Sequence, residues 1–174
     1  MDIKSKIRTI PDFPKKGIMF KDITTLLQDA HAFRHVVREM LHHFDGKKIT
    51  KVASAESRGF IFGSILAYEL HAGFVPLRKP GKLPAKTIKM EFDTEYSTDA
   101  FEIHEDAIQP GDNVLIVDDL LATGGTSKAA VYLAEKLGGK VIGLCFLIEL
   151  SFLHGRDKLK GYDILSLIKY DKEE

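Results

Sequence analysis

The segment "VLIVDDLLATGGTS", residues 114–127, constrains the fold of this chain more than any other stretch. A continuous apolar run that ends in two aspartates is typical of a parallel strand buried on both faces. The glycine pair leaves the backbone bare where the next helix begins, and helix N-termini hold phosphate through their unpaired N–H groups. Asp118 and Asp119 would then lie at the carboxyl edge of the sheet, where open α/β folds bind ligands. The segment therefore predicts an α/β fold with a ligand site at this edge.

The residue types in this segment indicate a phosphorylated sugar as the ligand. The carboxylates of Asp118 and Asp119 can accept hydrogen bonds from sugar hydroxyls or face a hard cation such as Mg²⁺. Gly124 and Gly125 permit positive φ, so the backbone can wrap an anion. The neighbouring hydroxyl donors are Thr123, Thr126 and Ser127. Ordinary helix capping would explain one threonine but not the paired aspartates and paired glycines, whereas a ribose 5-phosphate fits the whole segment.

Three other phosphate-binding or acidic motifs do not fit these residues. A P-loop needs a glycine–lysine–hydroxyl order that "ATGGTSK" lacks, and the dinucleotide fingerprint G-x-G-x-x-G is absent. A response-regulator receiver domain can open with an apolar strand ending in acidic residues. It would need more than the 56 residues, 119–174, that remain after Asp118.

Strands and helices are predicted to alternate along one domain of 174 residues. Helical spacing of apolar residues predicts a helix over 29–44, with Asp29 as its N-cap. Two further helices are expected at 59–70 and 124–139, and strands at 48–55, 73–79, 113–119, 140–150 and 163–168. This alternation predicts a parallel sheet covered on both sides. Residues 10–27 and 79–99 do not fit the alternation and are expected to be irregular, functional segments.

Composition excludes several classes of protein. Lysine plus arginine equals aspartate plus glutamate at 25 each, which argues against a nucleic-acid binder. The single cysteine, Cys145, lies in an apolar run and is expected to be buried. The histidines carry no zinc pattern, so no metal held by protein ligands alone is expected. Because no signal peptide and no apolar stretch of roughly 20 residues is visible, a soluble cytoplasmic protein that binds no membrane is expected.

Several segments together resemble one known family. "VLIVDDLLATGGTS" is similar to the phosphoribosyl pyrophosphate (PRPP) signature of the type I phosphoribosyltransferases. Further segments, spread along essentially the whole chain, resemble the adenine-specific branch of that family in their order and spacing. The segments are "IPDFPKKGIMFKDIT", "ESRGFIFG", "RKPGKLP", "EYSTDAFEIHEDAI" and "LKGYDILSLI".

The resemblance implies a Rossmann-like, parallel five-stranded sheet flanked by helices. It also implies a small N-terminal hood over about residues 1–30 and a flexible catalytic loop over about 80–99. The implied reaction joins adenine to PRPP and gives AMP and pyrophosphate, a step of purine salvage. Mg²⁺ would be bound mainly through PRPP or pyrophosphate, and the protein would be a homodimer.

The resemblance also implies a role for individual residues. The 5-phosphate and ribose would be bound by Asp118, Asp119, Ala122, Thr123, Gly124, Gly125 and Thr126. Pyrophosphate would be bound by Ser57, Arg58, Arg78, Lys79 and Lys82, with a cis peptide in the loop that holds Ser57. Adenine would be bound by Phe20, Lys21 and Leu120. Glu95 would be the general acid or base, next to Tyr96 in the flexible loop.

Other interpretations of these residues stay open. Phe20 could be a plain core residue, Lys79 and Lys82 surface lysines, and Glu95 part of a solvated acidic stretch. Lys21 stands where many family members have arginine, which puts the base contact in doubt. A phosphoribosyltransferase for xanthine or hypoxanthine is the alternative, although no lysine is evident for a 6-oxo group. A PRPP-binding regulator without catalysis would need a helix-turn-helix and a basic face, and neither is evident.

Overall fold

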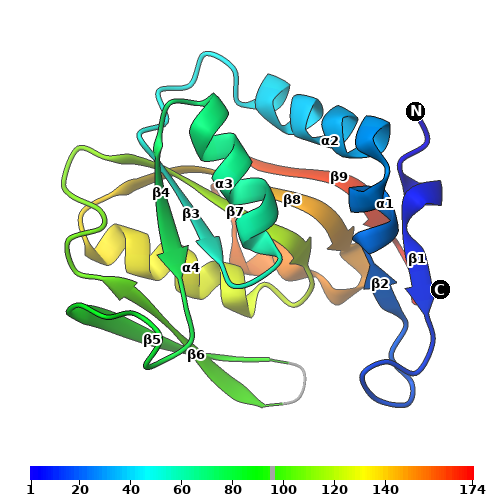
Figure 1. Cartoon of the computed structure of the whole chain (residues 1–174). Helices are drawn as coiled ribbons and strands as arrows, with labels where there is room; N and C mark the ends of the chain where they lie inside the picture. Colours follow the sequence, from blue (N-terminus) through cyan, green and yellow to red (C-terminus); the bar gives the residue numbers. More distant parts are fainter. Residues whose placement is uncertain (95–96) are drawn as a thin grey trace.

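The structure, a computed structural model, describes residues 1–94 and 97–174. Its centre is a parallel sheet of five strands in the spatial order β4-β3-β7-β8-β9 (Figure 1). The strands are β3 (Lys51–Ala55), β4 (Gly73–Leu77), β7 (Asn113–Leu121), β8 (Lys140–Leu150) and β9 (Ile164–Tyr170). The predicted α/β class with a five-stranded parallel sheet is confirmed.

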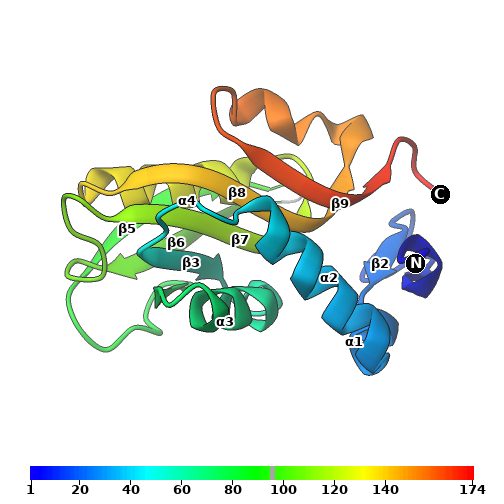
Figure 2. The ribbon, with the colours of Figure 1, turned by 90° about the horizontal axis from the view of Figure 1, so that it is seen from above.

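Helices cover both faces of this sheet (Figure 2). One face carries α1 (Thr24–Gln28), α2 (Ala30–His43) and α3 (Gly59–Glu69), and the other carries α4 (Gly125–Lys136). Side chains alternate along β7: Leu115 and Val117 belong to the core beside α2 and α3, whereas Val114 and Ile116 belong to the core beside α4. Because successive residues of a strand point to opposite faces, a strand covered on both sides must be apolar throughout.

The first long helix begins as its sequence predicts. The side chain of Asp29 accepts hydrogen bonds from the backbone N–H groups of His31 and Ala32, at 3.0 and 3.1 Å. These are two of the N–H groups that a helix leaves without an internal partner, so the predicted N-cap is confirmed.

The order of the strands sets the place of the ligand site. From β3 the chain passes through α3 to β4 on one side, whereas from β7 it passes through α4 to β8 on the other. β3 and β7 are neighbours, so the loops after them leave the sheet in opposite directions and open a crevice between them. Such a switch point at the carboxyl edge is where open α/β sheets bind ligands.

The two segments expected to be irregular contain regular structure. The N-terminal hood holds the 3₁₀ turn η1 (Lys4–Lys6) and an antiparallel pair, β1 (Arg8–Ile10) with β2 (Phe20–Asp22). The expectation for 79–99 was wrong in part, because β5 (Thr87–Asp93) pairs with β6 (Thr98–His104) as an antiparallel hairpin. Ile88, Met90 and Phe92 alternate along β5 and join the core beside α4. This alternation was the sequence signal for strand β5, but prolines and charged residues around the strand obscured the signal.

Two further boundaries affect the site. Strand β7 runs to Leu121, so the expectation that it ends at the two aspartates was wrong. Between β8 and β9 the chain forms two 3₁₀ turns, η2 (Ser151–Leu153) and η3 (Gly155–Lys158). In the part of the chain that the structure describes, no helix is long and apolar enough to cross a bilayer.

Candidate active site

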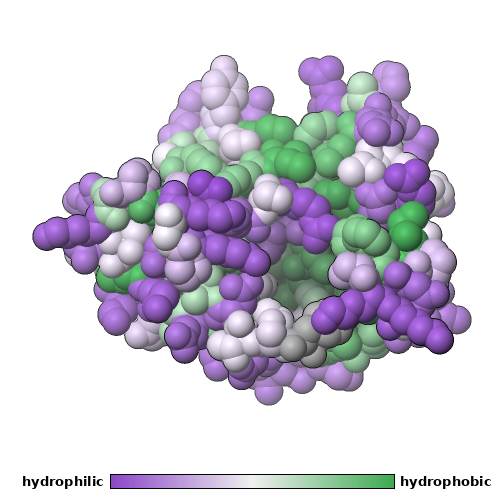
Figure 3. Space-filling view, turned by 60° about the horizontal axis from the view of Figure 1, so that its bottom comes forward, coloured by the Kyte–Doolittle hydropathy of each residue, from purple (hydrophilic) through white to green (hydrophobic). Residues whose placement is uncertain are grey.

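A cavity of about 700 Å³ opens at the switch point between β3 and β7. Figure 3 shows this face of the molecule, hollowed at its centre, with apolar surface in the hollow and hydrophilic residues around it. The predicted site residues that line the cavity are Phe20, Lys21, Ser57, Arg58, Lys79, Asp118, Asp119, Leu120, Ala122, Thr123 and Thr126. The fold therefore gathers predicted residues from four separate segments of the sequence into one place.

The two aspartates of β7 lie in this cavity in different surroundings. Asp119 is buried, and its Oδ2 lies 2.7 Å from Nε of Arg58. Asp118 accepts the backbone N–H of Asp119 at 2.8 Å and lies beside Gly59, the first residue of α3. Burial and the adjacent Asp119 carboxylate raise the pKa of Asp118 well above its usual range. A ligand that brings hydroxyl donors or positive charge would stabilise this pair.

The loop after β7 has the geometry of an anion-binding turn. Gly124 has φ 84° and ψ 0°, a left-handed conformation that favours glycine, and α4 begins at the next residue. Gly125 does not have positive φ, so the expectation of positive φ at both glycines holds only for Gly124. Ser127, expected to supply a hydroxyl donor, does not line the cavity. It is 3% exposed, and among the described residues its hydroxyl has no hydrogen-bond partner.

Close backbone contacts explain both glycines. A Cβ on Gly124 would lie 2.5 Å from the carbonyl oxygen of Gly155, and one on Gly125 would lie 2.5 Å from that of Asp93. From the other side, a Cβ on Gly155 would lie 2.3 Å from the carbonyl oxygen of Ala122. The turn at residues 122–125, which we call the phosphate loop for the role that the resemblance implies, is thus interlocked with the start of η3 and the end of β5, and no side chain fits between them.

A partly buried ion pair fixes the segment against which the phosphate loop packs. Arg156, next to Gly155, donates from Nε and Nη2 to Oε1 and Oε2 of Glu149 at 2.7 and 2.9 Å. Ser166 of β9 completes the group by contacting both residues. The side chain of Glu149 is only 5% exposed and that of Arg156 is 37% exposed. A two-pronged pair of this kind sets both the position and the orientation of η3.

Replacing Arg156 with methionine is expected to destabilise the protein, because it leaves Glu149 buried without its cation. The expected loss is about 2 to 4 kcal/mol, at or below the range for a fully buried pair since Arg156 is partly exposed. The double change Glu149→Leu and Arg156→Met is expected to recover most of that loss. Urea unfolding measures both, with Lys158→Met in the same turn as the control. Additive losses in the double variant would contradict the account.

The hood supplies one wall of the cavity. Phe20 of β2 lines it, and the guanidinium carbon of Arg58 lies 5.1 Å from the centre of the Phe20 ring. Phe13 packs edge-on against the same ring with centroids 5.1 Å apart. Leu120, from β7, also lines the cavity. An aromatic ring and an aliphatic side chain in one cavity suit a flat ligand with apolar faces.

Two of the predicted pyrophosphate cations, Arg78 and Lys82, direct their side chains to a carboxylate that the sequence analysis did not single out, whereas the Lys79 ammonium group pairs with Asp99. Glu56 accepts from Nε of Arg78 at 3.3 Å, Nζ of Lys82 at 3.0 Å and the backbone N–H of Lys79 at 2.8 Å. Burial would raise the pKa of Glu56, but these donors together lower it. The peptide bond between Glu56 and Ser57 is cis, as the resemblance implies. Glu56 therefore organises the cationic side of the site.

Other predicted residues lie outside the cavity or outside the described residues. Arg78, Lys82, Gly124 and Gly125 do not line it, although the two glycines shape its phosphate loop. Lys21 lines it, yet its ammonium group bonds to Thr9 and Glu174. Glu95 and Tyr96 lie outside the residues that the structure describes. The functional residues that were missed are Glu56, Gly155, Glu149 and Arg156. The only local signal was a carboxylate inside "SAESRG" and a glycine–arginine pair in "LHGRD".

The fold and the cavity together define a type I phosphoribosyltransferase, and the family model of the phosphoribosyl transferase domain matches residues 22–169. An adenine phosphoribosyltransferase from Symbiobacterium thermophilum is 57% identical over 98% of this chain and 100% of its own. The crystal structure of the adenine phosphoribosyltransferase from Thermoanaerobacter pseudethanolicus has a TM-score of 0.94 and 57% identity, covering 97% and 98% of the two chains. That of the Giardia lamblia enzyme with 9-deazaadenine has a TM-score of 0.93 and 44% identity, covering 98% and 97%. The chain belongs to the adenine phosphoribosyltransferase family.

Proposed function

We propose that this protein transfers the 5-phosphoribosyl group of PRPP to adenine, giving AMP and pyrophosphate, and so acts in purine salvage. The observation that carries the proposal is the single cavity that joins four features. These are an anion-binding turn, two carboxylates, a cationic side and an aromatic wall. Each matches one part of the reacting pair: the 5-phosphate, the ribose hydroxyls, the pyrophosphate and the base.

The chemistry assigns a task to each group. As pyrophosphate leaves, positive charge builds on the ribose ring, and the carboxylates of Asp118 and Asp119 stabilise it while they hold the ribose hydroxyls. Arg58 and Lys79 stabilise the negative charge that develops on the leaving group. The backbone N–H groups at the start of α4, with the hydroxyls of Thr123 and Thr126, fix the 5-phosphate. This fixed geometry makes the encounter of base and ribose effectively intramolecular.

The base is placed by apolar surfaces and main-chain atoms. Phe20 and Leu120 line the part of the cavity proposed for adenine, whose flat faces need no charged partner. The attacking nitrogen of adenine loses a proton overall, and Glu95 is proposed to take it. Closing of the loop around Glu95 would keep water from the reacting ribose.

Mg²⁺ is proposed as the cofactor, carried by PRPP and pyrophosphate. The oxygen donors in the cavity, Asp118 and Asp119, suit a hard cation that keeps most of its bonds to substrate oxygens and water. Among the described residues no group of three or more His, Cys, Asp or Glu side chains could hold a metal ion. Bound Mg²⁺ would neutralise charge that develops on pyrophosphate.

A homodimer and a cytoplasmic location belong to the same proposal. Large apolar side chains are exposed on several elements of the described chain, namely Phe13, Tyr68, Phe74 and Tyr132. Of these, Tyr68 of α3 and Phe74 of β4 stand on two contacting elements, and they are proposed to meet a second copy. Light scattering of the purified protein measures this directly, with a mass of twice 19.5 kDa expected.

An assay with five bases tests the proposed reaction. The protein is mixed with PRPP and Mg²⁺, and one base is added to each sample. The bases are adenine, hypoxanthine, guanine, xanthine and orotate, and pyrophosphate release is measured for each. Release is expected with adenine. Release with a 6-oxopurine in place of adenine would assign the protein to another branch of the family, and PRPP binding without any release would favour a regulator.

Replacing Glu95 with glutamine is expected to slow turnover by roughly 10²- to 10⁴-fold, the range for losing a general acid or base. The dissociation constant of PRPP should change little, because the proposed task of Glu95 concerns the proton of the base. Rapid-quench kinetics and calorimetry measure the two quantities separately. Glu91→Gln, an exposed residue of β5 in the same hairpin, is the control. Equal losses of turnover and PRPP binding would mean that Glu95 only positions the loop.

A further inference from the structure

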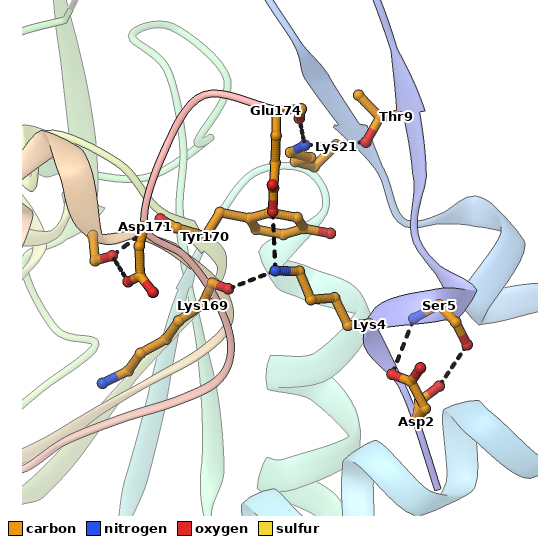
Figure 4. Close-up of polar contacts among 10 residues, drawn as sticks. Asp2, Lys4, Ser5, Thr9, Lys21, Lys169, Tyr170, Asp171 and Glu174 are labelled. Carbon is orange, nitrogen blue, oxygen red and sulfur yellow. Dashed lines mark hydrogen bonds and ion pairs between the residues drawn. The ribbon is translucent and has the colours of Figure 1, made fainter.

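Lys21 is a buried lysine whose ammonium group is engaged away from the predicted ligand. The residue is 8% exposed, and its Nζ donates to Oγ1 of Thr9 at 3.0 Å and to the backbone carbonyl oxygen of Glu174 (Figure 4). The same Nζ lies 4.1 Å from the centre of the Tyr170 ring. Burying a lysine is costly unless partners of this kind compensate it, so the arrangement calls for an explanation.

The partners of Lys21 belong to a segment that we call the C-terminal strap, residues Tyr170–Glu174. Tyr170 ends β9 and is 4% exposed, and its ring carries a second ammonium group, Nζ of Lys4, at 4.3 Å. Lys4 also bonds to the carbonyl oxygen of Lys169 and to Oε1 of Glu174, both at 3.2 Å. Figure 4 shows the Tyr170 ring, Lys4, Lys21 and Glu174 gathered between the strap and the hood. The strap therefore ties the hood to the edge of the parallel sheet.

The position of Lys21 in β2 links this tie to the cavity. Phe20 and Lys21 are neighbours in β2, and successive side chains of a strand point to opposite faces. The Phe20 ring lines the cavity and contacts Arg58, while Lys21 pairs with Thr9 across the β1–β2 ladder. The contacts that hold the Lys21 side chain therefore set how far the Phe20 ring reaches into the cavity.

Apolar packing does not fill the space behind the hood. A second cavity of about 370 Å³ lies between the hood and the strap, lined by Ile18, Met19, Lys21, Leu150, Phe152 and Glu174. Dense packing normally fixes one element against another, and here an open groove interrupts it. The polar contacts of Lys21 then add to the β1–β2 ladder in limiting movement of β2 towards that groove.

We propose that Lys21 is a positioning residue for base binding: held by the C-terminal strap, it fixes β2 so that Phe20 stands at its working distance from Leu120. The inference rests on the proposed function, in which this wall receives the base. It assigns the C-terminal strap a part in substrate affinity, although no strap residue lines the larger cavity. Glu173 and Glu174 line only the smaller one.

The test compares Michaelis constants for the two substrates. Lys21→Met keeps the aliphatic stem and removes the donor. It is expected to raise the KM for adenine about tenfold, the size of one lost charge-assisted hydrogen bond. The KM for PRPP and the turnover number at saturation should stay within about twofold, because the change weakens binding of the base in ground and transition states alike. Lys21→Arg, which restores a cation, is expected to return the KM for adenine to near the starting value.

A second variant leaves Lys21 itself in place. Residues 171–174 are exposed, so deleting residues 172–174 removes the carbonyl oxygen of Glu174 without touching the core. The same selective rise in the KM for adenine is expected. Lys47→Met is the matched control, because Lys47 also lies over an aromatic ring, that of Phe44 at 5.3 Å, and pairs with Asp163 far from the hood. It should change neither constant.

Hydrogen exchange separates a failure of this inference from a failure of the proposed function. Backbone amides of β2 are expected to exchange faster in Lys21→Met and in the deletion variant, whichever base the protein uses. An unchanged KM for adenine in both variants, equal rises for adenine and PRPP, or unchanged exchange in β2 would each overturn the inference. An unmodified protein that does not turn over adenine would instead overturn the proposed function.

Discussion

Replacing Gly124 with alanine is expected to raise the KM for PRPP by about 10- to 100-fold, because a displacement of the phosphate loop by a fraction of an ångström misplaces the ribose. The added Cβ would lie 2.5 Å from the carbonyl oxygen of Gly155, so one of the two backbones must move. Alanine at φ 84° also costs about 1–2 kcal/mol of stability by itself. Steady-state kinetics and thermal unfolding measure the two effects.

A matched control separates backbone strain from the close contact. Gly111 has φ 95° and nothing within 4 Å of an added Cβ. Gly111→Ala should therefore lose a similar amount of stability while the KM for PRPP stays the same. Gly155→Ala approaches the same contact from η3, since its Cβ would lie 2.3 Å from the carbonyl oxygen of Ala122. It should reproduce the effect of Gly124→Ala on PRPP, and a normal KM in Gly155→Ala would contradict the interlock.

Replacing Asp118 with asparagine is expected to make the protein more stable and less active. The asparagine oxygen can still accept the Asp119 N–H, while the half-buried charge next to Asp119 disappears. The expected gain near neutral pH is about 1 kcal/mol, or roughly 2–4 °C in Tm. The kcat/KM for PRPP should fall about 10- to 100-fold, as for the loss of one charged hydrogen bond in a transition state.

The effect of Asp118→Asn on the free energy of unfolding is expected to depend on pH. Asp118 has a folded-state pKa raised above its unfolded value near 3.8, so its ionisation opposes folding at neutral pH and not at acid pH. The stability advantage of Asp118→Asn should therefore grow as the pH rises from about 4 towards 7.

Asp112→Asn is the control of opposite sign. Although burial would raise it, the pKa of Asp112 is lowered by hydrogen bonds from Gln109 and Thr50. Its substitution should destabilise at neutral pH, and an Asp118→Asn variant that also destabilises there would contradict the account.

Local patterns in the sequence were sufficient for the sheet and for the centre of the site. The apolar run of β7 and the bare backbone at Gly124 predict a buried strand followed by an anion-binding turn, because burial and backbone conformation act over a few residues. The cap at Asp29 was predicted for the same reason. The strand β5 was missed because prolines and charges surround its short alternation, and tertiary packing against α4 decides its conformation.

Contacts between distant segments could not be predicted. Glu56 gathers Arg78 and Lys82 across more than 20 residues of sequence, and Gly155 meets the phosphate loop from a different turn. Local spacing in one sequence does not show that Glu56 or Gly155 makes these contacts. The partners of Lys21 in the C-terminal strap were hidden for the same reason.

The most direct test of the central claim follows both products of the reaction at once. AMP and pyrophosphate are quantified together after the protein is mixed with adenine, PRPP and Mg²⁺, beside a double variant with Asp118→Asn and Asp119→Asn. The account predicts AMP and pyrophosphate in equal amounts, and a rate at least about 10²-fold lower in the double variant. Pyrophosphate without AMP, or an undiminished rate in the double variant, would contradict it.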